Sequence, residues 1–322
     1  IVIGLGNIGF GYDCDMWEES SQVARTHAKA FELHPSYRLV GGIDKDVLKR
    51  RRFTEKTKVG AWRSIDDLIR GCEEKEIGCV AVATGAKHQL EIAEEVIQRL
   101  KPKVLVLEKP VAEDGEGIER IKKINENSGT KIFVNYQRVY LSGINSIKRS
   151  IIEGKYGRLL TGSVIYGKGL IRNGTHFINL LIHLFGSLEV AEVGSKCVRS
   201  GKDIEADFIV QCTEAHDQTI NLRSVGKYGV MAGEIDLWFE RARIIWRNQA
   251  SDIEVSFFRE QSDGWSVLGG VDMAIGINKD AYQLEVYDNI MRAINGQESM
   301  TCDLALAIKS VALALVVINR VK

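Results

Sequence analysis

The chain has 322 residues, of which 45% are hydrophobic and 27% charged, and its 43 Lys and Arg side chains balance its 43 Asp and Glu side chains. This length predicts about two globular domains, and the ordinary hydrophobic content argues against disorder. The zero net charge disfavours nucleic acid or an anionic membrane as a partner, because both select for a basic surplus.

Six cysteines are scattered along the chain, and no two of them have CxxC spacing. Scattered thiols are typical of a reducing compartment, so we expect a cytoplasmic protein. The longest apolar run, residues 311–318, is too short to span a membrane. The apolar start at Ile1 lacks the basic region of a signal peptide, and we expect a few native residues, including the initiator Met, to precede it.

Short apolar runs alternate with segments of helical spacing in the first part of the chain. The strands are expected at 1–5, 38–43, 79–83, 104–107 and 131–135, and the helices at 26–33, 65–69, 90–100 and 114–127. Strands that alternate with helices predict a parallel sheet with helices on both faces.

After residue 138 the pattern changes to helices followed by consecutive strands. Helices are expected at 142–152, 176–185, 279–294 and 303–319, and strands at 190–198, 206–212, 218–225, 234–239, 243–247 and 253–258. Consecutive strands separated by turn residues predict an open, mostly antiparallel sheet. The expected fold class is therefore α/β, with a doubly wound domain at 1–138 and an α+β domain at 139–322, whose last helix could pack back on the first domain.

A glycine-rich loop follows the first expected strand. Its six residues, Gly4-Leu5-Gly6-Asn7-Ile8-Gly9, have GxGxxG spacing. In such a loop the first glycine permits a tight turn, the second lets a pyrophosphate approach the backbone, and the third lets the next helix pack closely. The amino end of that helix adds partial positive charge. The loop predicts a Rossmann dinucleotide-binding domain, with Gly4, Gly6, Asn7, Ile8 and Gly9 at the phosphates.

Asp44 ends the second expected strand. A carboxylate there accepts hydrogen bonds from the adenosine ribose and repels the extra phosphate of NADP, so NAD is the expected cofactor and NADP the less favoured one. The alternative is an aspartate that serves only a turn. The gap from the loop is plainly longer than the usual distance of about 20 residues, which indicates an inserted segment around residues 10–25. We expect this polar, acidic segment to be either a lid or substrate contact, or a surface loop.

Glu108-Lys109-Pro110 stands at the carboxyl end of the strand expected at 104–107. A lysine at that end of a parallel strand points into the crevice where ligands bind. The proline fixes an extended backbone, and the bond before it could be cis. An ammonium group beside a cofactor can orient a substrate hydroxyl and ease its deprotonation. Alone, Lys-Pro is more often just a turn.

The order of these features along the chain resembles a known family. The GxGxxG loop, Asp44, Glu108-Lys109-Pro110 and the later Gly174-Thr175-His176-Phe177-Ile178-Asn179 are together similar to the glucose-fructose oxidoreductase, inositol dehydrogenase and MocA (Gfo/Idh/MocA) family. The resemblance covers essentially the whole chain. It implies a Rossmann domain followed by an open-sheet domain, and NAD(P)-dependent oxidation or reduction at a carbinol or carbonyl carbon, usually of a sugar or cyclitol.

The resemblance also implies two catalytic residues. Lys109 matches the family's catalytic lysine, and His176 matches its histidine, the usual proton acceptor or donor. A histidine titrates near neutral pH, which suits proton transfer. The alternative for His176 is a histidine that only packs in the core.

Two positions depart from the family pattern. Arg172 stands four residues before His176 where the family often has an aspartate, and Asn179 stands three residues after it where another aspartate is common. A guanidinium at this place suits an anionic substrate such as a carboxylate or phosphate, although a solvated arginine is equally compatible. Asn179 could still bind a substrate hydroxyl. His183 shares the helix face, but no carboxylate completes a metal site, so we expect no metal.

Further residues are candidates for cofactor or substrate contacts. For the cofactor they are Thr84, His88, Glu108 and Lys109, and for the substrate Tyr136, Arg138, Lys168, Arg172, Asn173 and Asn179. Each has a structural alternative, such as a helix start for His88 or a domain interface for Tyr136 and Arg138.

The sequence therefore predicts an NAD(P)-dependent dehydrogenase that acts on CH–OH groups of a sugar derivative. A nucleotide-linked or acidic sugar for surface glycan synthesis is favoured. The alternatives are a cyclitol dehydrogenase or aldose reductase on the same scaffold, an enzyme that keeps its NAD bound through turnover, or a non-catalytic protein that senses a dinucleotide. An open sheet needs cover, so we expect a homodimer or homotetramer through the C-terminal sheet, as the resemblance implies.

Overall fold

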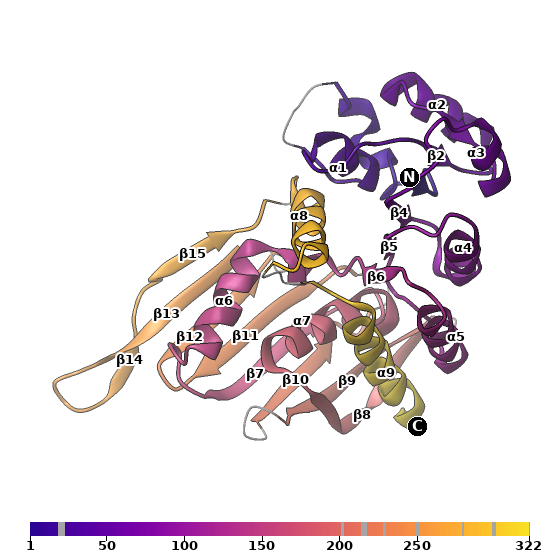
Figure 1. Cartoon of the computed structure of the whole chain (residues 1–322). Coiled ribbons are helices and arrows are strands. Elements are labelled where there is room, and N and C mark those ends of the chain that lie inside the picture. The colour runs from indigo at the N-terminus through magenta and orange to yellow at the C-terminus, as the bar shows by residue number, and fades with distance from the viewer. Residues whose placement is uncertain are drawn as a thin grey trace. The chain divides into compact units, whose positions relative to one another are not determined.

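The protein is described by a computed structural model, which covers residues 1–18, 23–200, 203–213, 218–227, 230–248, 252–278, 280–297 and 301–321. Part of the segment expected at 10–25 and the first residue of the helix expected at 279–294 lie outside these ranges. The chain forms two compact units (Figure 1): Ile1–Tyr140 with Lys279–Ala307, and Leu141–Asn278 with Ile308–Lys322. The domain bounds expected from the sequence, 1–138 and 139–322, differ from these units because they place residues 279–307 in the second domain. That division stays a prediction.

A parallel sheet forms the centre of the first unit. Its strand order is β3-β2-β1-β4-β5-β6, and each neighbouring pair is parallel. The strands are β1 (Val2–Ile3), β2 (Gly42–Ile43), β3 (Ala61–Trp62), β4 (Cys79–Val82), β5 (Val104–Leu107) and β6 (Lys131–Val134). From β1 the successive strands are added on one side as far as β3, and from β4 they are added on the other side as far as β6. The strand order therefore switches between β1 and β4, and ligands of such folds bind there, at the carboxyl ends of the strands. The predicted doubly wound α/β architecture is confirmed.

Six α-helices of the described residues accompany this sheet. They are α1 (His27–Leu33), α2 (Val47–Thr57), α3 (Ile65–Gly71), α4 (Ala86–Arg99), α5 (Gly115–Glu126) and α8 (Tyr282–Ile294). In α5 the buried side chains Ile118, Ile121 and Ile124 follow helical spacing, and Asp114 caps the helix by accepting a hydrogen bond from Gly117 N. Burying each isoleucine stabilises the fold by about 2 kcal/mol.

Neither α2 nor β3 was expected from the sequence. Phe53 is the one buried residue of α2, so this highly charged helix carries no apolar stripe for a pattern to reveal. The strand β3 has only two residues and reads as part of a loop. Both elements are held by their neighbours in the sheet rather than by their own sequence.

The second unit contains a nine-stranded sheet of described residues. Its order is β14-β13-β12-β11-β7-β10-β9-β8, and β15 pairs with β13. The strands are β7 (Leu159–Tyr166), β8 (Leu188–Ser200), β9 (Asp203–Cys212), β10 (Gln218–Ser224), β11 (Gly233–Phe239), β12 (Ala242–Arg247), β13 (Asp252–Glu260), β14 (Ser266–Leu268) and β15 (Met273–Gly276). Apart from the parallel pair β7 and β10, the neighbours are antiparallel, which confirms the predicted sheet type.

One face of this sheet is covered by α6 (Ser142–Ile152), α7 (Thr175–Phe185) and α9 (Leu304–Arg320) (Figure 1). Burial alternates along the central strands, as in β11, where Ile235, Leu237 and Phe239 are buried and the residues between them are more exposed. The strands β7, β14 and β15 were not expected from the sequence.

Candidate functional site

The glycine loop at the end of β1 has the shape that its spacing predicts. Gly4 has φ +93°, and a Cβ there would lie 2.7 Å from Ala83 O. A Cβ on Gly9 would lie 1.9 Å from Gly4 O. By contrast, a Cβ on Gly6 would meet no atom within 4 Å. Gly4 and Gly9 are therefore required by internal packing, whereas Gly6 leaves open space over its backbone. Asn7 is exposed and Ile8 half-buried beside it.

The helix after this loop is interrupted by the inserted segment. A 3₁₀ helix, Gly11–Met16, follows the loop, and α1 starts only at His27. His27 N donates to Ile8 O over 3.1 Å and Ala28 N to Gly9 O over 3.0 Å, which are the bonds that an uninterrupted helix would make. The insertion is thus a detour within one helix. The helix expected at 26–33 is found as α1, behind this segment.

The described part of the detour is packed rather than free. The ring of Phe10 lies 5.3 Å from that of Trp17 and 5.1 Å from that of Phe53 on α2. The buried Lys29 ammonium donates to Trp17 O over 2.6 Å. These contacts attach the segment to α1 and α2.

A buried carboxylate closes the detour where it rejoins α1. Asp13 Oδ2 accepts hydrogen bonds from Arg25 N at 3.0 Å and from Thr26 Oγ1 at 2.7 Å. Burial raises the pKa of Asp13, while the hydrogen bond from Thr26 works in the opposite direction. Thr26 in turn caps α1 by accepting from Lys29 N. The start of α1, and with it His27, is held by the inserted segment.

Asp44 lies at the end of β2, next to the glycine loop. Its Oδ2 accepts a hydrogen bond from Leu5 N over 2.8 Å and its Oδ1 one from Asp46 N over 2.9 Å. Lys49 Nζ lies 3.7 Å from Oδ2. Each carboxylate oxygen keeps a further lone pair for a donor such as a ribose hydroxyl. The open space at Gly6 and this fixed acceptor together fit a dinucleotide, which the loop and Asp44 would hold.

The Glu108-Lys109-Pro110 turn leaves the carboxyl end of β5, and its Lys109–Pro110 bond is cis, as the sequence allowed. Lys109 is half-buried. The buried side chain of Gln89 on α4 donates to Glu108 O over 2.8 Å and to Pro110 O over 3.2 Å, so one amide group holds the backbone on both sides of Lys109. Gln89 was not expected as a functional residue from the sequence.

The carboxylate of Glu108 faces into the unit. Its Oε1 accepts a hydrogen bond from Asn135 Nδ2 over 2.7 Å and lies 3.0 Å from His27 Nε2. His27 and Asn135 are buried. Glu108, expected as a cofactor contact, therefore has internal partners for one of its oxygens.

The other expected residues of the first unit occupy different surroundings. Thr84 follows β4 against the glycine loop, and its buried hydroxyl has no hydrogen-bond partner among the described residues. His88 is on the surface of α4, 60% exposed, with Glu91 3.7 Å away. Tyr136 is buried, and burial lowers the pKa of Arg138 to about 10.

His176 belongs to the second unit, where it lies in the first turn of α7, half-buried. A π-helix, Leu170–Gly174, leads into α7 and carries Arg172, whose side chain is exposed. Lys168 precedes it, exposed and at φ +67°. Two cationic side chains thus stand on the segment that precedes the histidine.

Two expected substrate contacts of this unit have internal partners. Asn173 Nδ2 donates to Gly167 O over 2.8 Å and to Ala232 O over 3.1 Å. The fully buried Asn179 donates through Nδ2 to Ser310 Oγ over 2.9 Å. Their amide groups hold the segment around His176 in place, and substrate contact by either residue stays a prediction.

Two buried carboxylates that the sequence analysis did not single out hold the π-helix. Asp203 Oδ1 accepts from Ile171 N over 2.9 Å, and Oδ2 accepts from Arg172 N over 3.2 Å. Glu205 Oε1 accepts from Gly169 N over 3.1 Å. Both lie on β9 with side chains pointing into the unit. Acidic residues at two core-facing positions of a strand are the sequence signal that could have revealed them.

His183 lies on α7, buried, with Nε2 3.2 Å from Asn145 Oδ1. Burial, with a smaller contribution from the charge of Lys148, lowers the pKa of His183 to about 3. Among the residues that the structure describes, no three His, Cys, Asp or Glu side chains are grouped to hold a metal ion.

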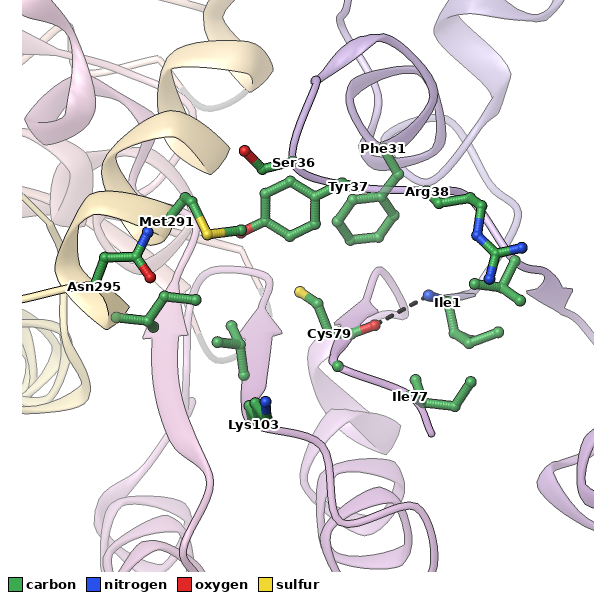
Figure 2. A pocket seen from close by; sticks show the side chains of 14 residues that line it. Ile1, Phe31, Ser36, Tyr37, Arg38, Ile77, Cys79, Lys103, Met291 and Asn295 are labelled. Atoms are coloured by element: carbon green, nitrogen blue, oxygen red, sulfur yellow. Dashed lines mark hydrogen bonds between the residues drawn. The ribbon is translucent and has the colours of Figure 1, made fainter. Parts of the chain in front are cut away.

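A cavity of about 380 Å³ opens in the first unit at the amino ends of the parallel strands (Figure 2). Phe31, Tyr37 and Met291 line it, together with Cys79 and Lys103. Cys79 begins β4 and Lys103 directly precedes β5, so the cavity lies at the amino ends of the strands. Dinucleotides bind at the opposite, carboxyl ends. The cavity is therefore not the place where the glycine loop and Lys109 meet a ligand.

Within the described ranges, the helices are all too short or too polar to cross a membrane.

Comparison with known proteins agrees with this geometry. Residues 1–136 match the model of the oxidoreductase family with an NAD-binding Rossmann fold, GFO_IDH_MocA. Glucose-6-phosphate 3-dehydrogenase of Bacillus subtilis (strain 168) is 26% identical over 147 residues, which are 45% of this chain and 40% of that enzyme. The chain thus matches less than half the length of this curated relative.

Solved structures resemble the whole chain in fold. The WlbA dehydrogenase from Bordetella pertussis, in complex with NADH and UDP-GlcNAcA, has a TM-score of 0.72 at 19% identity, with 99% of this chain and 93% of that chain covered. An oxidoreductase from Agrobacterium radiobacter, in complex with NAD+, L-tartaric acid and magnesium, has a TM-score of 0.72 at 13% identity, with 100% and 96% covered. At this identity the likeness concerns the fold. The family model confirms the resemblance seen in the sequence over residues 1–136, which match the NAD-binding Rossmann fold of this oxidoreductase family.

Proposed function

We propose that the protein is an NAD-dependent dehydrogenase that acts on a CH–OH group of an anionic sugar derivative. The observation that carries the proposal is that three features follow the carboxyl ends of β1, β2 and β5, which form one side of the parallel sheet. The open glycine loop, the fixed carboxylate of Asp44 and the Lys109 turn all follow strands at this one edge. In a parallel sheet that edge is the ligand crevice.

The residues of this edge have separate tasks. Gly4, Gly6 and Gly9 shape the pyrophosphate site, and Asp44 accepts hydrogen bonds from the ribose of NAD and disfavours a phosphate there. NAD, when bound, supplies the hydride acceptor or donor that no side chain can provide. The Lys109 ammonium orients the substrate hydroxyl and stabilises the negative charge that develops on its oxygen. His176 takes the proton from that oxygen, or returns it, through an imidazole nitrogen.

The preference for an anionic substrate rests on the segment before His176. Lys168 and Arg172 are both exposed there, and Asp203 fixes the backbone amide of Arg172. A guanidinium binds carboxylate or phosphate through paired hydrogen bonds. Two relatives support this substrate class: one is named for a sugar phosphate, and one was crystallised with an acidic nucleotide sugar.

Two further parts of the proposal concern the cellular context. The cysteines that the structure describes, Cys14, Cys72, Cys79, Cys212 and Cys302, are free thiols, which supports a reducing, cytoplasmic location. Exposed apolar side chains on the sheet of the second unit, such as Leu160 and Ile165, support assembly of this face with a second copy.

The test is turnover of NAD with a panel of neutral, phosphorylated, acidic and nucleotide-linked sugars, followed by the absorbance of reduced nicotinamide. We expect one anionic sugar to be oxidised, and Lys109→Ala to lower kcat at least about a hundredfold. Lys103→Ala is the matched control, because Lys103 precedes the same strand at its opposite end. NAD binding without turnover of any sugar would instead favour a protein that retains its cofactor or senses it.

A further inference from the structure

A chain of buried hydrogen bonds runs from Glu108 into the interior of the first unit. Beyond the bond to Glu108, His27 Nδ1 lies 2.6 Å from Tyr287 Oη and 2.9 Å from Gln283 Nε2, both on α8. His27, Gln283 and Tyr287 are completely buried, and Asn135 is 1% exposed. Two segments far apart in the sequence, α1 and the end of β6, thus meet at one carboxylate oxygen, and α8 is joined to them through His27.

The partners fix the tautomer of His27. The amide nitrogen of Gln283 can only donate, so Nδ1, which has a single lone pair, is the acceptor on the side that faces α8. The remaining nitrogen, Nε2, then carries the hydrogen and donates it to Glu108 Oε1.

The network uses only one side of the Glu108 carboxylate. His27 and Asn135 both bind Oε1, and the structure gives Oε2 no hydrogen bond among the described residues. The side chain is 13% exposed, so it borders the surface on which Lys109 follows directly. A charged group anchored at one oxygen holds a single rotamer, and its other oxygen keeps a constant position.

The backbone of this turn already has its own support in Gln89, which binds Glu108 O and Pro110 O. The side chain of His27 is therefore not needed to hold the backbone of this turn. What it adds is the direction of the Glu108 side chain. A purely structural contact at this place could be apolar, because well-packed hydrophobic residues are as stabilising as a buried polar pair.

We propose that His27 is a positioning residue of the active site, which acts through Glu108 to fix the surroundings of the Lys109 ammonium. This inference rests on the role proposed for Lys109. The inserted segment serves the same end, since Asp13 fixes Thr26 directly before His27. The effect is on geometry at the reacting group and not on the affinity for NAD, because the side chain of His27 makes no hydrogen bond to the glycine loop or to Asp44.

The experiment compares His27→Gln, which keeps a side-chain N–H donor, with His27→Leu, which removes it. We expect His27→Leu to lower kcat about tenfold to hundredfold with little change in KM or in the dissociation constant of NAD, and His27→Gln to restore most of the loss. His34→Leu is the matched control: His34 is also a buried histidine, at the end of α1, facing Asp288 of α8 at 3.9 Å, but it does not contact Glu108.

A second readout needs no substrate. The rate at which an amine-reactive reagent labels Lys109, measured by mass spectrometry of the folded protein, should change about threefold or more in His27→Leu, in the range of one hydrogen bond. Lys103 in the same samples should label at an unchanged rate. This arm still tests the inference if no sugar is oxidised by the wild type, so failure of the proposed function is recognised separately.

Two results would overturn the inference. One is unchanged kcat and unchanged Lys109 labelling in His27→Leu protein that binds NAD normally. The other is an equal loss of kcat in His27→Leu and His34→Leu, in proportion to their loss of stability, because this would reduce His27 to a packing residue. Should His27→Leu not fold, Glu108→Gln replaces it: the same labelling change is expected, and an unchanged rate counts against the proposal.

Discussion

The backbone amide of Leu5 donates a hydrogen bond to Asp44 Oδ2 over 2.8 Å, so the phosphate loop and the expected ribose acceptor are joined directly. Asp44 thereby supports the loop, and we propose that the same carboxylate recognises the cofactor. A substitution of Asp44 should therefore weaken the binding of NAD more than that of NADP.

We expect Asp44→Ser to weaken NAD binding about tenfold to hundredfold, because hydrogen bonds to a charged acceptor and the support of Leu5 N are lost. Binding of NADP should improve relative to NAD, since the repulsion of its extra phosphate is removed. Fluorescence titration with both reduced cofactors measures this. The control is Asp46→Ser: Asp46 caps α2 by accepting from Leu48 N and makes no bond to the loop. An equal loss for both cofactors would show that Asp44 only supports the loop.

The glycines of the loop should respond differently to alanine. Gly6→Ala introduces a methyl group into open space, so the protein should fold with unchanged stability and lose NAD affinity. Gly9→Ala places a methyl group 1.9 Å from Gly4 O, which should cost about 3 kcal/mol or more of stability. Thermal unfolding separates the two variants. Normal NAD affinity in folded Gly6→Ala would show that the pyrophosphate does not pass over this residue.

The sequence was sufficient to predict those features whose signal comes from neighbouring residues. The glycine spacing, the acid at the end of β2 and the helical pattern of α5 each depend on neighbours within one or two turns of chain, and the structure has them where they were expected. The unusual distance from the loop to Asp44 was also readable. The detour between Tyr12 and Thr26 accounts for the excess over about 20 residues.

The sequence was not sufficient where a residue acts through contacts distant along the chain. His27 is defined by Glu108 and by Tyr287, which come much later in the chain, and no local pattern joins them. Asp203 likewise reveals its role only beside Ile171. Such pairs follow from the tertiary fold, so a single sequence can name the catalytic candidates but not the residues that hold them.

The π-helix before His176 should depend on Asp203. Its carboxylate accepts hydrogen bonds from the amides of Ile171, Arg172 and Ile204, and Asp203→Ala leaves these donors without an acceptor. We expect Asp203→Ala to lower the free energy of unfolding by about 3 kcal/mol, and Asp203→Asn to lower it by less, because an amide oxygen still accepts a hydrogen bond. In the folded variants KM for the anionic sugar should rise, because Arg172 is no longer fixed.

Chemical denaturation and steady-state kinetics with one neutral and one anionic substrate check this. Asp207→Ala is the control, since Asp207 also lies on β9 but accepts from Ser224 N, away from the π-helix. Equal effects of Asp203→Ala and Asp207→Ala on KM would refute a specific link between Asp203 and substrate binding.

Stability should fall in mild acid because of His183. Its pKa is lowered from 6.5 to about 3 by burial and by Lys148, so below pH 6.5 the unfolded chain binds a proton that the folded chain does not take up. Stability from this group is therefore complete above pH 6.5 and decreases by about 1.4 kcal/mol for each pH unit below it, down to about pH 3.

Between pH 6.5 and pH 5 we expect a loss of about 2 kcal/mol, which His183→Gln should remove because glutamine does not titrate. Denaturant unfolding at a series of pH values compares the wild type with His183→Gln and with His88→Gln, which replaces an exposed histidine. The same acid-induced loss in His183→Gln would assign it to other groups, such as the buried carboxylates.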